Sequence, residues 1–391
     1  MLKRKSMIFL FVMGWTFLPS WAADDRSHPN KKDVKQTPFL EIRLHDLGYL
    51  PEPEYRYPGT GIPRDLSILN EDSKKRLAFV SDKVLAVYFS HLPALPNNKG
   101  LATESLSMEA FFVDPNLGSL ISRKTWATRK RKWLNERWDT QARILPVSEG
   151  FLVHAGNSLI LYSADQREKA KISLDDQFRW AATVPPLGRT VHLQQIENDN
   201  NAEGAWLASD TLHKIATQLE PAGVVSASDN AVATKLSHCV QMQSLGESPR
   251  DLCCHDPCRL GLPEFLSGTE ILNVYPNGFE VLSDHADMLW GREAAGSKTR
   301  IIESHERSLD RSRFATTLSS DRNIVFDQVN IAKGQTTILI YDRVGRDRVF
   351  ALPLGVVEQL SFCLSPNGSV LAVLVGDAIR LYKVPSVLPQ S

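Results

Sequence analysis

The sequence predicts an all-β fold of about seven four-stranded units in one domain, and three observations lead to that prediction. Short apolar runs, separated by Gly, Asn and Asp turns, alternate with polar positions or are apolar on both faces. Almost no segment has the 3.6-residue apolar period of a helix. A four-strand pattern recurs with a period of about 40 to 45 residues, which is typical of a single β-propeller.

The C-terminal unit shows the pattern most clearly. A predicted strand, residues 360–364, leads into the turn Ser365-Pro366-Asn367-Gly368, where Asn-Gly supplies the positive φ angles of a tight hairpin. The run Val370–Val375 is too short for a helix and too apolar for an exposed strand, so we expect a buried inner strand. A Gly376-Asp377 turn and a third strand, residues 378–383, complete what remains of the chain's last unit.

The N-terminus predicts export. Lys3, Arg4 and Lys5 precede the apolar run Met7–Leu18, which is shorter than the ~20 residues that span a bilayer. Small residues follow, with cleavage expected after Ala22 or Ala23; a retained N-terminal anchor is the alternative. We therefore expect a signal peptide over 1–22, a flexible lead-in over 23–37 and the propeller over 38–385, in a periplasmic or secreted protein.

The net charge and the apolar segments of the chain indicate which kinds of partner to expect. Without the three N-terminal basic residues the chain has 42 Lys and Arg against 45 Asp and Glu, a net charge of −3, which argues against a nucleic-acid partner. No second long apolar segment exists, so we expect no membrane span in the mature chain, which we predict to be monomeric and without a cofactor.

The predicted strands fall into successive units. The first has strands over 75–81, 84–90, 108–114 and 119–126, and the second over 142–147, 150–155, 158–163 and 169–174. The third runs from Trp180 to Leu219, and the fourth starts at Val224 and dissolves into a polar, Cys-rich stretch. The fifth contains 270–275, 279–282, 287–290 and 299–303, and the sixth 313–318, 324–329, 336–342 and 347–352.

The ends of the chain are predicted to meet. The last unit has only three strands, and the segment Phe39–His45 alternates apolar and polar residues without a neighbouring hairpin partner. We expect this segment to be the outer strand of the last unit. Such closure of the ring removes an exposed sheet edge.

The residues Leu360-Ser361-Phe362, Ser365-Pro366-Asn367-Gly368, Leu371-Ala372-Val373 and Ile379-Arg380-Leu381-Tyr382 resemble WD40-like and YVTN-type propeller repeats. Asn367 stands where such repeats have Asp, and the Gly-His and Trp-Asp pairs of strict WD40 repeats are absent from these units. The resemblance implies a propeller fold and little about function, because propellers include both binding modules and enzymes.

Four cysteines form the most unusual local cluster: Cys239, Cys253, Cys254 and Cys258. In an exported chain we expect two disulfides, with three pairings open. The alternatives are a metal site with His238 and His255, or thiols that are reduced or partly paired. Cys363, on a predicted inner strand, is expected to be a buried free thiol.

Two further segments are candidate sites. Asp199, Asn201 and Glu203 weakly resemble an EF-hand calcium loop, and an acidic turn explains them equally well. A basic and aromatic segment could bind an anionic polymer or a glycan, or could be a solvated connection: Trp126, Arg129, Lys130, Arg131, Lys132, Trp133 and Trp138.

No nucleophile elbow, zinc-protease motif or phosphate-binding loop occurs, and the catalytic residues are therefore unknown. The leading hypothesis is a non-enzymatic exported propeller that binds a protein or glycan through loops on one face. The alternative is a propeller enzyme, a hydrolase, lyase or oxidoreductase, with its site at the mouth of the central channel. Three or more acidic, His or Arg side chains around that channel would favour the enzyme.

Overall fold

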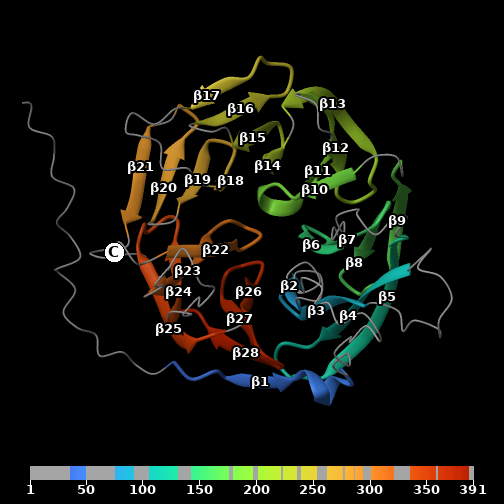
Figure 1. Cartoon of the computed structure of the whole chain (residues 1–391), viewed down its shortest axis with the longest axis vertical. Coiled ribbons are helices and arrows are strands. Elements are labelled where there is room, and N and C mark those ends of the chain that lie inside the picture. The colour runs from blue at the N-terminus through green and yellow to red at the C-terminus, as the bar shows by residue number, and fades with distance from the viewer. Residues whose placement is uncertain are drawn as a thin grey trace, which may run out of the picture. The chain divides into compact units, whose positions relative to one another are not determined.

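In the computed structural model, residues 36–391 form one compact unit of seven antiparallel four-stranded sheets arranged as the blades of a ring (Figure 1). The structure describes residues 36–49, 75–91, 105–130, 142–175, 179–196, 201–221, 223–235, 239–252, 262–275, 278–285, 287–293, 301–320, 335–357 and 360–386. The fold is a seven-bladed β-propeller, as the repeat pattern predicts.

The first four blades follow one another in chain order. Blade 1 consists of β2 (Arg76–Ser81), β3 (Val84–His91), β4 (Ser105–Val113) and β5 (Leu120–Lys130). Blade 2 consists of β6 (Arg143–Val147), β7 (Gly150–Ala155), β8 (Ser158–Ser163) and β9 (Glu168–Ser173). Blade 3 consists of β10 (Arg179–Thr183), β11 (Thr190–Ile196), β12 (Asn201–Ala208) and β13 (Lys214–Pro221). Blade 4 consists of β14 (Val224–Ala227), β15 (Ala231–Lys235), β16 (Val240–Ser244) and β17 (Arg250–Leu252).

The last three blades complete the ring. Blade 5 consists of β18 (Leu262–Phe265), β19 (Glu270–Tyr275), β20 (Gly278–Ser283) and β21 (Met288–Glu293). Blade 6 consists of β22 (Ile301–Arg307), β23 (Arg313–Ser320), β24 (Gln335–Asp342) and β25 (Arg348–Val356). Blade 7 consists of β26 (Leu360–Leu364), β27 (Val370–Val375), β28 (Ala378–Lys383) and β1 (Leu40–Arg43). Two 3₁₀ turns are added, η1 (Leu44–Leu47) and η2 (Pro186–Gly188).

The N-terminal strand closes the ring. Strand β1 pairs with β28 in antiparallel register, and Glu41 lies opposite Arg380. The Arg380 Nε atom lies 3.0 Å from Glu41 Oε2, and Ile42 is buried against the blade. The prediction of a closing outer strand is therefore confirmed, with the strand ending at Arg43 and η1 following it.

The predicted strand groups are wrong in blades 4 to 6. Blade 4 does not dissolve, because β16 and β17 pair through residues 240–242. The segment near 299–303 is not the last strand of blade 5 but begins β22, the inner strand of blade 6. Strand β23 pairs directly with β24, so the predicted strand 324–329 has no place between them, and its residues lie outside the described ones.

A serine turn after the inner strand explains the shift in blade 6. Ser365 Oγ accepts a hydrogen bond from the Val370 backbone N–H (3.0 Å) and donates one to Asn367 Oδ1 (3.0 Å). Ser308 makes the same two contacts, with the Arg313 N–H (3.1 Å) and Asp310 Oδ1 (2.6 Å). The residue equivalent to Ser365 is thus Ser308, so the inner strand of blade 6 is the one that ends before Ser308.

The core lies between neighbouring blades, where apolar faces of adjacent sheets pack together. Between blades 1 and 2, the ring centroids of Phe112 and Phe151 are 5.2 Å apart, and Phe151 stacks on Tyr162 at 5.1 Å. The second strands of blades 2 and 7 are buried on both sides. This explains why runs such as Val370–Val375 have no polar face.

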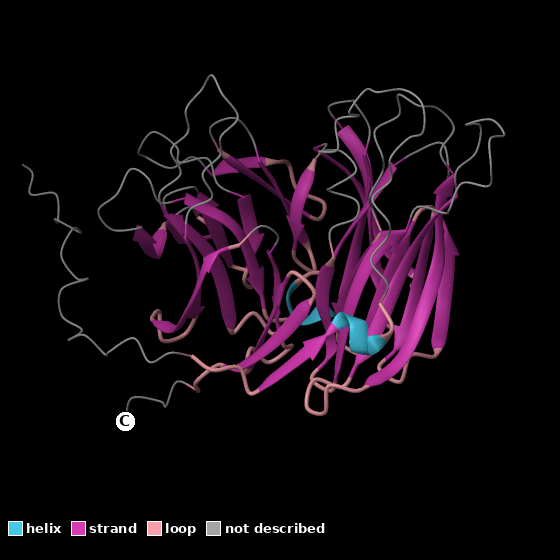
Figure 2. Cartoon of the chain, turned by 60° about the horizontal axis from the view of Figure 1, so that its bottom comes forward, coloured by secondary structure: helices cyan, strands magenta, loops and turns pink. Residues whose placement is uncertain are grey.

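The antiparallel order gives the propeller two different faces (Figure 2). We call the end at which the inner strands finish the turn face, because short turns join first to second and third to outer strands there. We call the other end the insertion face; the long connections 50–74, 92–104, 131–141 and 321–334 join strand ends there. Within the described part of the chain, no helix has the length and apolar character needed to cross a membrane.

Candidate functional site: the central channel

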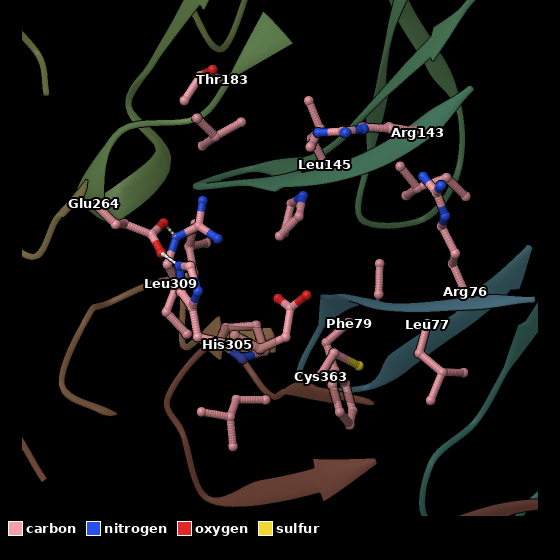
Figure 3. A pocket seen from close by; sticks show the side chains of 18 of the residues that line it. Arg76, Leu77, Phe79, Arg143, Leu145, Thr183, Glu264, His305, Leu309 and Cys363 are labelled. Atoms are coloured by element: carbon pink, nitrogen blue, oxygen red, sulfur yellow. Dashed lines mark hydrogen bonds and ion pairs between the residues drawn. The ribbon is translucent and has the colours of Figure 1, made fainter. Parts of the chain in front are cut away.

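The inner strands of all seven blades line a central cavity of about 480 Å³ (Figure 3). Charged and imidazole side chains converge on it from four separate parts of the chain: Arg76, Arg143, Glu264, His305, Glu306, Arg307 and Arg311. Four arginines outnumber two glutamates, so the cavity has a net charge of +2 when both carboxylates are ionised. Its volume lies in the range of small-molecule sites, roughly 300–1,000 Å³.

One side of the cavity, which we call the paired wall, has its charges neutralised by contact. Glu264 of β18 is buried, and its Oε2 atom lies 3.1 Å from the Nε2 atom of His305 on β22. Its Oε1 atom forms an ion pair with Nε of Arg307. Burial lowers the pKa of His305, so the imidazole is mainly neutral at pH 7 and its contact with Glu264 is a hydrogen bond.

Arg311 belongs to the same wall and connects three blades. Its Nη1 atom donates to the Ser308 carbonyl and its Nη2 atom to the Val184 carbonyl, each at 3.0 Å, and Nη2 lies 4.0 Å from Glu264 Oε1. Burial lowers the pKa of Arg311 to about 9, which leaves the guanidinium charged at neutral pH. The paired wall therefore uses its arginines to hold blades 3, 5 and 6 together.

The opposite side, which we call the open wall, carries two arginines that lack such partners. Arg76 and Arg143 are the first residues of the inner strands β2 and β6 in adjacent blades, and Figure 3 shows both on the side of the cavity away from Glu264. Among the described residues, no hydrogen bond or ion pair holds either guanidinium. Both are placed near the insertion face, because inner strands start there.

Glu306 interacts electrostatically with residues of both walls. Burial raises the pKa of its carboxyl to about 7, against the lowering effects of His305, Arg143, Arg311 and Arg76. The carboxyl therefore titrates near neutral pH, where its protonated and ionised forms both occur. At that pH it can either donate or accept a hydrogen bond, and can donate or take up a proton.

The channel is bridged at the turn face. The turns after the inner strands of blades 3 and 6, on opposite sides of the ring, meet where the Leu187 N–H donates to the Leu309 carbonyl (3.0 Å). The Asp310 N–H donates to the Pro366 carbonyl of blade 7 (3.1 Å). Figure 1 shows η2 reaching toward the middle of the ring. An elongated polymer thus meets an obstruction at this end.

The described part of the basic and aromatic segment belongs to β5, the outer strand of blade 1, and not to an inner strand. Trp126 is buried between blades 1 and 2, where its indole N–H donates to Tyr162 Oη at 2.9 Å. Arg129 and Lys130 end strand β5. Arg131, Lys132, Trp133 and Trp138 lie outside the described residues, so a ligand-binding role for this segment stays a prediction.

The cysteine and calcium candidates are only partly described. Cys239 immediately precedes β16, whereas Cys253, Cys254 and Cys258 lie outside the described residues, so the disulfides stay a prediction. Cys363 is a buried free thiol, as predicted. Asn201 and Glu203 belong to strand β12, where Glu203 lies 3.5 Å from Lys214, and Asp199 is outside the described residues. No group of three metal-ligand side chains occurs within the described ranges.

Sequence reasoning missed the channel residues because blades 1, 2 and 5 contribute one each and blade 6 the other four. Arg76 and Glu306 are far apart in the sequence, and no local motif connects them. A usable signal existed only for β22, whose sequence IIESHER precedes the Ser308 turn. Three adjacent polar residues at the end of an inner strand indicate that the strand faces a lumen.

No protein-family model and no curated protein sequence matches the chain. Among solved structures, a mitotic checkpoint complex has a similar chain at 12% identity, with 92% of this chain and 99% of that chain covered and a TM-score of 0.48. The C-terminal WD40 domain of Sif2 is similar at 10% identity, covering 81% and 98% with a TM-score of 0.40. Kuenenia stuttgartiensis hydrazine synthase is similar at 14% identity, covering 60% and 73% with a TM-score of 0.42. The topology of the chain itself shows the fold, a seven-bladed β-propeller.

Proposed function

We propose that this chain is an exported binding protein that holds a small molecule, or one end of a larger ligand, in its central channel. The observation that carries the proposal is the cavity of about 480 Å³ on which seven charged or imidazole side chains converge from separate blades. A ligand would enter from the insertion face, because the turns of blades 3 and 6 meet across the other end.

Export is supported by the basic N-terminus and the apolar run that ends before Ala22. An oxidising compartment would allow the Cys-rich segment to form disulfides. Val240 pairs with Leu252, so continuing that register by one residue would set Cys239 opposite Cys253, and this is the pairing we propose to test first. Peptide mapping under non-reducing conditions, with and without prior reduction, would identify the bonds.

A larger partner, a protein or a glycan, would meet the insertion face before the channel. The connections that carry Arg129 to Lys132 and the Cys-rich segment both join strand ends on that face. The tryptophans at 133 and 138 lie within the first of these connections, and indoles stack on sugar rings. We propose that these connections add contacts to a ligand whose end is held in the channel.

Ligand-detected NMR with a library of sugars, amino acids, organic acids and nucleotides tests channel binding. Val225 lines the channel and is 40% exposed, so Val225→Trp should block the cavity without disturbing the core. Val356, on an outer strand and 64% exposed, provides the matched control Val356→Trp. Hits that bind the unmodified protein and Val356→Trp but not Val225→Trp support the proposal. A library without hits, or hits that the blocked variant retains, would contradict it.

A second candidate is catalysis in the channel, because the seven charged or imidazole side chains meet the criterion expected of an enzyme. Four of the seven pair with one another, and Glu306 is the carboxyl that remains for chemistry. A carboxyl with a pKa of about 7 is suited to general acid–base chemistry at neutral pH. Each ligand found by NMR can be incubated with the protein and followed for product formation. Turnover that Glu306→Gln abolishes while binding persists would establish an enzyme, and unchanged ligand after prolonged incubation would leave binding alone.

A further inference from the structure

We infer that the channel recognises an oxyanion, a carboxylate or phosphate carried by a small molecule or by the end of a longer one, between Arg76 and Arg143. The inference rests on the proposed function and names the chemistry of its ligand.

The first argument is the contrast between the channel's arginines. Arg307 and Arg311 are occupied by the Glu264 carboxylate and by backbone carbonyls. Arg76 and Arg143 face the same cavity, and no described residue forms an ion pair or hydrogen bond with them. Two guanidinium groups on adjacent inner strands present the forked donors that bind carboxylate and phosphate oxygens.

The second argument is electrostatic. The Glu264 carboxylate is already neutralised by the paired wall, so Glu306 alone opposes the charge of Arg76 and Arg143. With Glu306 protonated, the cavity carries a net charge of +3 from the four arginines and Glu264. Low-dielectric walls strengthen such an attraction for an anion.

The third argument concerns the shape of the ligand. The Leu187–Leu309 backbone hydrogen bond joins opposite sides of the ring below the charged residues, at the turn face. Among the described charges that line the channel, Arg76 and Arg143 lie nearest the insertion face, where a ligand would enter. The channel therefore suits a compact anion or a terminal group, and not the middle of a threaded polymer.

Three sugars that share the same ring separate the sources of the anion: glucose, glucuronate and glucose 6-phosphate. We expect glucuronate, glucose 6-phosphate or both to bind the full exported chain at least tenfold more tightly than glucose in calorimetric titrations at pH 7. Binding of glucuronate alone identifies a carboxylate site, and binding of the phosphate ester alone a phosphate site. Succinate and inorganic phosphate test whether the anion suffices without a sugar.

The variants Arg76→Gln and Arg143→Gln should each weaken binding of the tighter anion at least tenfold. Arg167→Gln is the matched control, because Arg167 is 85% exposed on a turn outside the channel and should leave the affinity unchanged. Equal binding of glucose and both anions, or no binding of any of the five probes at 10 mM, would overturn the inference. So would anion binding that neither channel variant changes.

The two proposals fail differently. Neutral library ligands that Val225→Trp blocks, together with absent anion binding, would retain the channel site and refute its anion preference. A blocked variant that binds every ligand as before would refute the channel site itself. Thermal unfolding of each variant confirms that a lost affinity does not reflect a lost fold.

Discussion

The two walls of the channel use the same residue type in opposite ways. On the paired wall, Arg307 and Arg311 contact a buried carboxylate and two carbonyls, and so they connect blades. On the open wall, Arg76 and Arg143 reach the same cavity without a described partner. The comparison teaches that a converging set of charges is not by itself a site; the unpaired members of the set are the ones available to a ligand.

The largest effect should come from breaking the paired wall. Glu264→Ala leaves Arg307, Arg311 and His305 facing one another without a carboxylate, and removing one partner of a buried ion pair costs about 3–5 kcal/mol. Urea unfolding followed by tryptophan fluorescence measures this loss. Glu149→Ala is the control, because Glu149 is 63% exposed and its contact with Lys169 should contribute less than ~1 kcal/mol. Equal losses in the two variants would contradict a structural role for the buried ion pair of Glu264.

Glu306 should give a smaller, pH-dependent effect. Its pKa is about 7 in the folded protein against an ordinary value of 4.5, so its contribution to stability falls as pH rises from 4.5 to 7. The difference corresponds to about 3 kcal/mol. We compare the free energy of unfolding of Glu306→Gln with that of the unmodified protein at each pH. The variant's advantage should be larger at pH 8 than at pH 4 by about this amount. A stability difference that stays constant between pH 4 and 8 would show that Glu306 is not held in a desolvated environment.

His154, which lies opposite Arg143 of the open wall, should give a pH dependence of stability opposite in sign to that of Glu306. Burial, and secondarily Arg143, lower the pKa of this imidazole to about 4 from 6.5, and His154 lies opposite Arg143 in the β6–β7 register. Its contribution to stability is present above pH 6.5 and is lost as pH falls toward 4, by about 3 kcal/mol in all. In His154→Asn this acid-induced loss should disappear, as measured by urea unfolding at pH 7 and pH 4.5. An unchanged pH dependence would exclude a buried neutral imidazole.

The smallest effect on stability is expected for the open wall itself. Arg76→Gln and Arg143→Gln remove no described ion pair or hydrogen bond, so the free energy of unfolding should change by less than ~0.5 kcal/mol. Removing Arg143 should also raise the pKa of His154, which NMR titration of the imidazole can detect. A loss above ~2 kcal/mol in either variant would mean that these arginines are structural.

The sequence predicts the blades best where their second and third strands are buried on both sides. Val370–Val375 and Ser158–Ser163 are apolar and bounded by tight turns, and both are strands in the structure. An inner strand is harder to predict where polar side chains that line the channel interrupt its apolar pattern. β22 is the example, and its sequence IIESHER led to an incorrect division of blades 5 and 6.

The channel site itself could not be predicted in the same way. Glu264 and Arg307 become neighbours only because β18 and β22 are inner strands of adjacent blades, and Arg76 and Arg143 only because β2 and β6 are. A ring brings residues together by their position within the repeat and not by local spacing. The useful sequence observation is therefore which residues begin or end each inner strand, once the blades are correctly divided.

The closing blade has a consequence for the order of events during synthesis. Glu41 and Arg380, which pair across β1 and β28, are separated by 339 residues. At roughly 5–20 residues per second, the first strand to be made waits about 20–70 s before its partner exists. Until then the chain has an open sheet edge at each end. Secretion in an unfolded form, or protection by a chaperone, would suit a protein whose first and last strands must meet to complete the ring.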